Sequence, residues 1–331
     1  MEKWSQFRII GNASEEEKNK AKEELFGDLK ENHLSEMDRA SLAELKAKEY
    51  PKNKDEIFLI DLINKETNKL MEDLGFQSFD IPEKNFHIIP ADLYKKYHNG
   101  SESAGSAVYE AQAISLKADD IRRHLIVFAS VSFHEALHLK AKQVMQVSSF
   151  EDEAGVVIKK GLYKTGITAY SPKTKDGGES IHSHFKGLHE AIVSNEQKKF
   201  VEKLMKLDMF SDLRQYMQSS EVMEERLELW QNRKIPIDEI YYTNKAENSL
   251  AIISYPKQRE AFLYVCEEIS NDLGVSREDI EREFLKAHFS GRTQHIAKLI
   301  EGSFGKGSFR ELGSLGTDSN SALNVLESLK K

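Results

Sequence analysis

The chain has few cysteines and prolines and no long hydrophobic run. Its 331 residues include six prolines and a single cysteine, Cys266. One cysteine excludes an internal disulfide framework and suits a reducing compartment, and apolar spacing around Cys266 predicts a core position. The longest apolar run, centred on residues 125–132, is too short to span a bilayer, and the N-terminal residues lack the apolar region of a secretory signal. We therefore expect a cytoplasmic protein with no membrane partner.

Positive charge is also scarce. The 47 lysines and arginines are outnumbered by 55 aspartates and glutamates, which gives a formal net charge of −8 at pH 7. A protein that binds nucleic acid by neutralising phosphates needs the opposite balance, so no nucleic-acid partner is expected. Hydrophobic residues make up 39% of the chain, which is enough to bury one large core or two modest ones.

The most informative feature is the pentapeptide H-E-A-L-H at residues 134–138. An α-helix has about 3.6 residues per turn, so positions i and i+4 share a face, and His134 and His138 can bind one metal ion. Glu135, between them, can then reach a water molecule on that ion. This combination is typical of a zinc hydrolase.

The surrounding sequence predicts a helix through this motif. Asp119 or Asp120 can cap its start, apolar residues recur at helical spacing from 121 to 139, and neither proline nor glycine interrupts the segment. A buried helix with two incidental histidines is the alternative interpretation, because a five-residue match can arise by chance. The helical context favours the metal site.

A catalytic zinc site needs a third protein ligand and leaves its fourth position to water. The extended pattern H-E-x-x-H-x-x-G-x-x-H is absent, since Ala141 and Val144 stand where it requires glycine and histidine. The third ligand must therefore come from further along the chain. Glu190 is the first candidate, because it lies among the apolar residues 188–193, where an unpaired carboxylate costs several kcal/mol. The rival ligands are His182, His184 and His189.

At these two motifs the chain resembles the glutamate zincins, or gluzincins, over about residues 80 to 260. In that family, H-E-x-x-H on one helix is completed by a glutamate in an N-E-A-like motif on a later helix. The second motif here reads L-H-E-A-I, and Glu190 follows His138 by 52 residues. The resemblance implies a zincin-like catalytic domain with one zinc ion per chain, bound by His134, His138 and Glu190.

Two residues depart from the family pattern. His189 stands where asparagine is common, and Ser194 stands where an acidic residue often follows one turn after the third ligand, although Glu196 is nearby. Such acidic residues orient a zinc-bound imidazole through its second nitrogen. The departure leaves the ligand assignment intact and weakens or retunes the site.

The resemblance also implies a mechanism. Zinc lowers the pKa of a bound water towards about 7, and Glu135 accepts the proton and passes it to the leaving amine. Gluzincins place a tyrosine or histidine downstream of the third ligand as an oxyanion donor. Tyr255 is the first candidate here, followed by Tyr163 and Tyr170, and each is also a candidate for simple packing. Arg259 could bind a substrate carboxylate, and a solvated arginine on a helix surface is the simpler interpretation.

Composition and periodicity divide the chain into three parts. They predict a helical N-terminal region at 1–78, the catalytic domain at 79–301, and a Gly/Ser-rich tail with a short helix at 302–331. Capping boxes are predicted in the first part at Ser14 with Glu17 and at Ser41 with Glu44. The predicted fold class is α+β, predominantly helical, with a small sheet.

Short strands are predicted on both sides of the motif helix. Before it, strands at 85–90 and 107–116 are separated by a polar loop, and the second is the candidate for binding extended substrate beside the cleft. After it, residues 156–170 alternate like a hairpin that turns at Lys160 and Gly161, and a polar loop follows at 171–180.

These features predict a zinc-dependent hydrolase that cleaves peptide bonds in a peptide or protein substrate. The alternative from another class is a non-catalytic zinc-binding or protein-interaction module. Glu135 favours the enzyme, because a structural zinc site needs no general base and usually has four protein ligands. Substrate specificity depends on the shape of a pocket, which the spacing of motifs does not encode.

Overall fold

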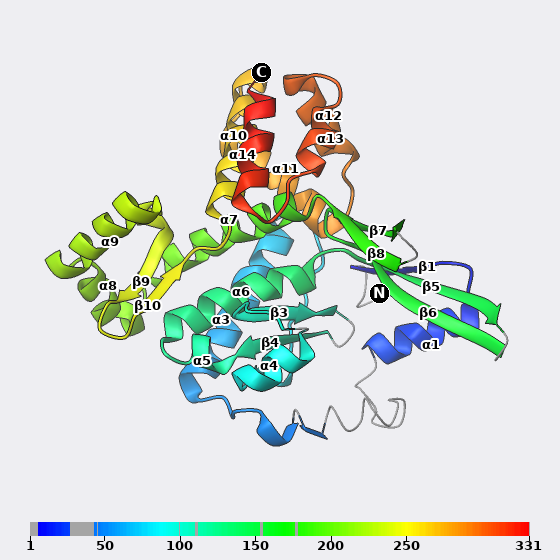
Figure 1. Ribbon diagram of the computed structural model, residues 1–331, viewed down its shortest axis with the longest axis horizontal. Coiled ribbons are helices and arrows are strands. Elements are labelled where there is room, and N and C mark those ends of the chain that lie inside the picture. The colour runs from blue at the N-terminus through cyan, green and yellow to red at the C-terminus, as the bar shows by residue number, and fades with distance from the viewer. Residues whose placement is uncertain are drawn as a thin grey trace.

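The computed structural model describes residues 6–26, 43–44, 46–98, 100–109, 112–152, 155–175 and 178–330. Within these ranges the chain is mainly helical and carries three small sheets, so the predicted α+β class is confirmed. Helices α3 (Lys54–Asp73), α6 (Leu125–Lys140) and α7 (Lys186–Leu204) cross the middle of the molecule (Figure 1).

Helix α6 occupies the centre because it has no polar face. All of its residues except Leu125 and Val131 are buried. A helix that is apolar on every side is stable only in the interior of a protein. It packs against α3, against α7 and against a three-stranded sheet, and this position places the H-E-A-L-H motif inside the molecule (Figure 1).

The predicted helix start at Asp119 or Asp120 is wrong. Both residues lie in a separate short helix, α5 (Ala118–Ile121). Arg122, between α5 and α6, pairs with Glu56 of α3 at 3.1 Å. This ion pair joins residues that are 66 positions apart in the sequence, and local periodicity cannot reveal such a contact.

A buried lysine holds the C-terminal end of α6. Nζ of Lys140 donates to Oγ1 of Thr67 at 2.7 Å and to Oδ1 of Asn68 at 2.6 Å, both on α3, and it lies 5.5 Å from the centre of the Phe79 ring. Burial lowers the pKa of this ammonium group to about 7, and nearby carboxylates oppose the effect only in part. Lys140 therefore fixes α6 to α3 next to the histidine motif.

The three-stranded sheet has the strand order β2-β4-β3. Its strands are β2 (Phe86–Ile89), β3 (Gly105–Val108) and β4 (Ala113–Lys117). The single strand predicted over 107–116 is therefore wrong, because the segment forms two antiparallel strands that reverse at the left-handed residue Gln112 (φ 47°). No glycine or proline marks this reversal in the sequence.

Strand β3 is the edge of that sheet nearest to α6. Among the described strands it pairs only with β4. Gly105 permits the close approach, because a Cβ there would lie 2.5 Å from Cγ1 of Val131 and 3.1 Å from Cγ of Glu135. One edge of β3 therefore remains available beside the motif.

The second sheet has five strands, β1 (Phe7–Ile10), β5 (Gln143–Asp152), β6 (Gly155–Thr165), β7 (Thr168–Lys175) and β8 (Gly178–His184), in the order β1-β5-β6-β7-β8. The predicted turn at Lys160 and Gly161 is wrong, since β6 continues through both residues and the chain reverses at Gly166 (φ 52°). The predicted polar loop at 171–180 is wrong as well, because β7 and β8 pair across it.

The N-terminal part contributes a strand as well as helices. β1 lies parallel to β5, and the sequence did not predict it. Helix α1 (Glu15–Phe26) has the predicted capping box, because Oε2 of Glu17 accepts from the N–H of Ser14 at 2.7 Å and Oγ of Ser14 accepts from the N–H of Glu17 at 3.2 Å. Ser41, in the second predicted box, lies outside the described residues.

The C-terminal segment fixes the start of α7. The N–H of Gly187 donates to the carbonyl of Leu315 at 2.9 Å, and a Cβ on Gly187 would lie 2.2 Å from the carbonyl oxygen of Gly316. Two helices form where the sequence predicted one short helix in the tail. The elements after α7 are α8 (Ser211–Met217), α9 (Ser220–Arg233), β9 (Ile240–Asn244), β10 (Ser249–Ile252), α10 (Pro256–Leu273), α11 (Arg277–Ser290), α12 (Gln294–Phe304), α13 (Ser308–Gly313) and α14 (Ser319–Leu329).

One hydrophobic core joins the three parts that composition distinguished. It includes Leu59 of α3, Ala136 of α6 and Val325 of α14. Cys266 of α10 lies in this core, as its apolar neighbours predicted. Among the described residues, no helix combines the length and the apolar character needed to cross a bilayer.

Candidate metal centre

Three side chains meet where α6 packs against α7. Nε2 of His134 and Nε2 of His138 are 3.0 Å apart, and Oε2 of Glu190 lies 3.3 Å from the first and 3.2 Å from the second. Ligand atoms about 2.1 Å from a tetrahedral zinc ion lie roughly 3.4 Å from one another. The spacing fits three corners of such a site, so this trio could hold a metal ion.

The two helices bring the trio together through simple geometry. His134 and His138 lie one turn apart on α6, with ring centres 4.8 Å apart in an edge-to-face arrangement. Glu190 lies near the beginning of α7, the end that the C-terminal segment fixes. The fold therefore brings together the three residues that the sequence singled out as ligands.

The charges within the trio compensate one another. Burial opposes the ionised form of Glu190, but His138 and His134 outweigh that effect and hold the pKa of Glu190 well below its ordinary value. Burial likewise opposes the protonated form of His138, but Glu190 outweighs it and raises the pKa of His138. A buried carboxylate kept ionised beside two imidazoles is a donor set that suits a divalent cation.

An amide on α7 orients the first histidine. Oε1 of Gln197 lies 3.2 Å from Nδ1 of His134. The amide nitrogen of Gln197 donates to the carbonyl of Ser130 at 3.2 Å and to its Oγ at 2.9 Å. Because the carbonyl can only accept, the amide oxygen must face the imidazole, so Nδ1 carries the proton and Nε2 presents its lone pair to the trio.

Sequence reasoning missed Gln197, although a signal was present. Gln197 follows Glu190 by two turns of α7, so both residues face α6. The family pattern directs attention to positions 194 and 196 instead. Ser194 is buried, and its hydroxyl donates to the carbonyl of Ala191 at 3.3 Å.

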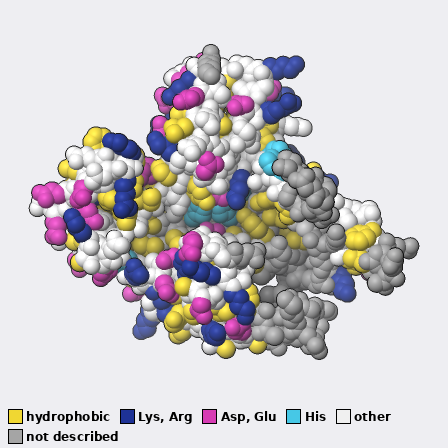
Figure 2. Space-filling model, viewed as in Figure 1, with side chains coloured by type: hydrophobic (Ala, Val, Ile, Leu, Met, Phe, Trp, Pro, Cys, Tyr) yellow, Lys and Arg dark blue, Asp and Glu magenta, His cyan; other side chains and the backbone are white. Residues whose placement is uncertain are grey.

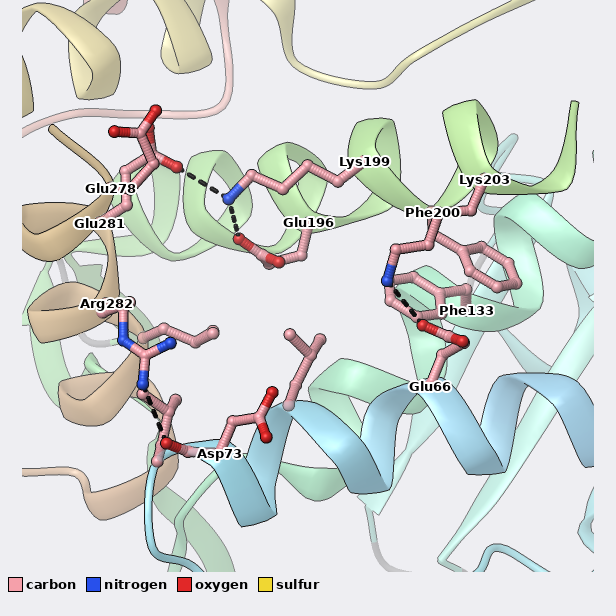
Figure 3. A pocket seen from close by; sticks show the side chains of 13 residues that line it. Glu66, Asp73, Phe133, Glu196, Lys199, Phe200, Lys203, Glu278, Glu281 and Arg282 are labelled. Atoms are coloured by element: carbon pink, nitrogen blue, oxygen red, sulfur yellow. Dashed lines mark hydrogen bonds and ion pairs between the residues drawn. The ribbon is translucent and has the colours of Figure 1, made fainter. Parts of the chain in front are cut away.

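Glu196 faces a different part of the molecule. It lines a cavity of about 260 Å³ between α3, α7 and α11 (Figure 3). There Nζ of Lys199 lies 2.7 Å from a carboxylate oxygen of Glu196 and 2.8 Å from one of Glu281. Its carboxylate is therefore engaged by a lysine rather than by the histidines of the trio.

The rival ligand His189 makes contacts outside the trio. Its Nδ1 lies 2.8 Å from Oγ1 of Thr168. Its Nε2 packs against Gly166 so closely that a Cβ on that glycine would lie only 2.9 Å from it. Burial and the neighbouring His288 and His138 hold the pKa of His189 well below its ordinary value. His189 packs edge-to-face on His138 with ring centres 4.9 Å apart, so it supports the trio as a neutral neighbour.

The other two rival ligands are on strand β8. His182 and His184 are exposed, with ring centres 4.5 Å apart. They are not part of the cluster formed by His134, His138 and Glu190. The exposure expected for both histidines is confirmed, although they lie on a strand rather than after a loop.

Glu135 lies between α6 and the edge strand β3. Its side chain is buried, and its Cγ is close to Gly105. Burial raises the pKa of Tyr255, and the charges of Glu190 and Glu135 raise it further. Glu135 therefore shares the interior of the site with Glu190.

Tyr255 lies beside the first histidine. Its ring centre is 6.2 Å from that of His134, with the two planes 26° apart. It is the residue before α10 and adopts a left-handed backbone (φ 57°, ψ 48°). The structure therefore brings this tyrosine to the trio, whereas Tyr163 of β6 is 44% exposed.

Another tyrosine near the site was missed by sequence reasoning. Burial raises the pKa of Tyr109 well above its ordinary value, and the charges of Tyr170, Glu190 and Glu135 raise it further. Tyr109 directly follows β3, and its place within 107–116, the strand expected to border the cleft, was the available signal. Tyr170, one of the predicted alternatives, lies on β7.

The interpretation of Arg259 as a solvated surface residue is wrong. The side chain is 2% exposed, and its guanidinium donates to the carbonyl of Ser254 and pairs with Glu239. Ser254 and Glu239 therefore occupy the guanidinium N–H groups that a substrate carboxylate would have used. Its burial depends on β9 and η5 (Ile237–Glu239), which are distant in sequence.

The face shown in Figure 2 is hollowed in its middle. Histidine side chains are visible at the bottom of the hollow, and hydrophobic side chains lie beside them. The trio keeps a small exposure consistent with such an opening, 8% for each histidine side chain and 12% for Glu190. The chain was compared with known proteins. No family model, curated protein or solved structure matches it.

Proposed function

We propose that the chain is a zinc-dependent peptidase with a zincin-like catalytic unit. The observation that carries this proposal is the convergence of His134, His138 and Glu190 beside the buried Glu135. Two imidazoles and one carboxylate are the donor set of a catalytic zinc site, in which three protein ligands leave one position open. A structural zinc site usually has four protein ligands.

The side chains around the trio have separate tasks in this proposal. Zinc, when bound, acidifies a water molecule and polarises the carbonyl of the scissile bond. Glu135 accepts the proton of the attacking water and delivers it to the leaving nitrogen. Tyr255 donates a hydrogen bond to the developing oxyanion, and its raised pKa keeps the hydroxyl protonated for that purpose.

Strand β3 is the proposed binding strand for an extended substrate. Its unpaired edge lies on the same side of α6 as Glu135, and Gly105 brings the two into contact. A peptide that added to this edge would be held by main-chain hydrogen bonds, independently of its sequence. The substrate-binding role predicted for 107–116 is thus assigned to β3, since β4 pairs with a strand on each of its edges.

A non-catalytic zinc-binding module is the alternative from another class. Such a module would have no use for a buried carboxylate at Glu135, which costs free energy without a proton-transfer role. Gln197 also fixes the tautomer of His134, which is of value where the ligand geometry must be exact to a fraction of an ångström. These two features favour the enzyme.

Metal analysis combined with cleavage of a diverse peptide library tests the proposal. We expect close to one zinc ion per chain, cleavage that stops on chelation, and recovery when zinc is added back. Stoichiometric zinc without cleavage of any library member would favour the non-catalytic module. Purified protein that takes up no zinc would overturn both.

A further inference from the structure

A buried ion pair lies directly behind Tyr255. Arg259, one turn into α10, donates through its guanidinium to the carbonyl of Ser254 and to the carboxylate of Glu239. Both partners of the pair are buried. A buried ion pair of this kind rarely adds stability over apolar packing, so its benefit must be sought in the geometry that it imposes.

The ion pair lies next to Tyr255, whose backbone is strained. Tyr255 has a left-handed backbone, which is uncommon for residues other than glycine and asparagine. It also precedes Pro256, and the residue before a proline is biased towards extended backbone. Strain of this kind persists only where the surroundings impose it, and it concentrates at functional sites.

Arg259 holds the chain on both sides of this strained residue. Its side chain binds the carbonyl of Ser254, and its main-chain N–H donates to the carbonyl of Tyr255 at 3.0 Å. Glu239 adds a further restraint, because its carbonyl accepts from the N–H of Ile253 at 2.8 Å. The segment that leads into Tyr255 is therefore held at successive peptide groups.

The same network reaches the helix that carries Glu190. Nζ of Lys198, on α7, lies 3.1 Å from Oε1 of Glu239 and 2.5 Å from Oδ2 of Asp238. Lys198, Glu239 and Arg259 thus form a chain of charges from α7 to the Tyr255 segment. Movement of either element relative to the other would break it.

We infer that Lys198, Glu239 and Arg259 form a positioning network that holds Tyr255 in its left-handed conformation beside the trio. Arg259 is the central member, since its planar fork binds the carboxylate and the carbonyl at the same time. The inference rests on the proposed function for its catalytic consequence. The conformational part stands on the backbone geometry alone.

The conformational part can be tested without any activity. Glycine tolerates the left-handed region and alanine does not, so Tyr255→Gly should melt at a higher Tm than Tyr255→Ala. In an Arg259→Lys background, where the fork is lost and the charge is kept, this Tm gap should shrink. Equal Tm values for the two variants in the otherwise unaltered chain, or a gap unaffected by Arg259→Lys, would overturn the inference.

The catalytic part is tested by a double-mutant comparison of kcat. Tyr255→Phe should lower kcat about 100-fold, Arg259→Lys about 10-fold or more, and the double variant no further than Tyr255→Phe alone. Zinc content should stay stoichiometric in all three. Multiplicative losses would show that Arg259 does not act through Tyr255.

Arg122→Lys is the matched control. The guanidinium of Arg122 also binds one main-chain carbonyl, that of Pro51, and one carboxylate, that of Glu56, and none of these residues belongs to the network. It should leave both the Tm gap and kcat unchanged. If the protein cleaves no peptide, the proposed function fails, and the Tm comparison still decides whether Arg259 holds the strained backbone.

Discussion

Gln197 accepts a hydrogen bond from Nδ1 of His134 at 3.2 Å, so an amide on α7 fixes the orientation of this imidazole. The amide is locked in turn by Ser130, one turn before His134 on α6. A neutral acceptor orients the imidazole without adding negative charge to the site. By contrast, Nδ1 of His138 is buried without a hydrogen-bond partner among the described residues.

Replacing Gln197 should change zinc affinity. Gln197→Leu removes the acceptor for Nδ1 of His134, so we expect affinity to fall about 10- to 100-fold in a chelator competition assay. Glu196→Gln is the matched control, because Glu196 lines the cavity and pairs with Lys199, and its loss should leave zinc affinity unchanged. An unaltered affinity in Gln197→Leu would contradict the orienting role.

Removing ligands should remove the metal. His134→Ala should cause a sharp drop in zinc content measured by elemental analysis, and Glu190→Gln should weaken zinc binding because an amide is a poorer ligand than a carboxylate. His182→Ala tests a rejected ligand and should keep full zinc content. Retention of stoichiometric zinc when His134→Ala and His138→Ala are combined would show that the metal binds elsewhere.

Tyr255→Phe deletes one hydroxyl and preserves the ring that lies beside His134. If that hydroxyl donates to the oxyanion, kcat should fall about 100-fold while KM changes little, because the interaction forms mainly in the transition state. Tyr163→Phe, at an exposed position on β6, should leave kcat unchanged. Steady-state kinetics with wild-type kcat in Tyr255→Phe would assign Tyr255 to packing.

Lys140 should make the free energy of unfolding depend on pH above neutrality. The pKa of its ammonium group is about 7 in the folded protein against an ordinary value of 10.5. Between these values the unfolded chain binds the extra proton, so stability should rise with pH and then level off. The rise is on the order of 1 kcal/mol per pH unit at most.

Lys140→Met removes that titrating group and fills the same space. Urea denaturation of the metal-free protein between pH 7.5 and about pH 10 should therefore give a flatter stability profile for the variant than for the unaltered chain. The metal ligands do not interfere with the comparison, because both proteins carry them and their titration contributes to both profiles. Parallel profiles would mean that Lys140 is protonated in the folded protein.

The candidate ligands could be predicted from the sequence because the relevant geometry is local. Any helix places residues i and i+4 on one face, and a carboxylate among apolar residues such as Glu190 requires a buried partner wherever it occurs. The mainly helical α+β class followed in the same way from periodicity. These features do not depend on which segments meet in the folded chain.

Features that depend on long-range contacts could not be predicted. Arg122, between α5 and α6, pairs with Glu56 of α3, and the buried Arg259 pairs with Glu239. The reversal occurs at Gly166, where a Cβ would lie 2.9 Å from Nε2 of His189, and not at Gly161, where a Cβ would meet nothing within 4 Å. The sequence shows where glycines lie, but the close contacts that exclude a side chain at one of them arise only in the folded state.

Glu135→Gln tests the central claim most directly. The substitution preserves side-chain size and leaves the trio intact, but it removes the base, so the variant should keep one zinc ion per chain while peptide cleavage drops at least about 100-fold. Zinc content and the cleavage rate must be measured on the same preparation. Cleavage at the wild-type rate with zinc retained would contradict the account, because Glu135 would then have no role in proton transfer.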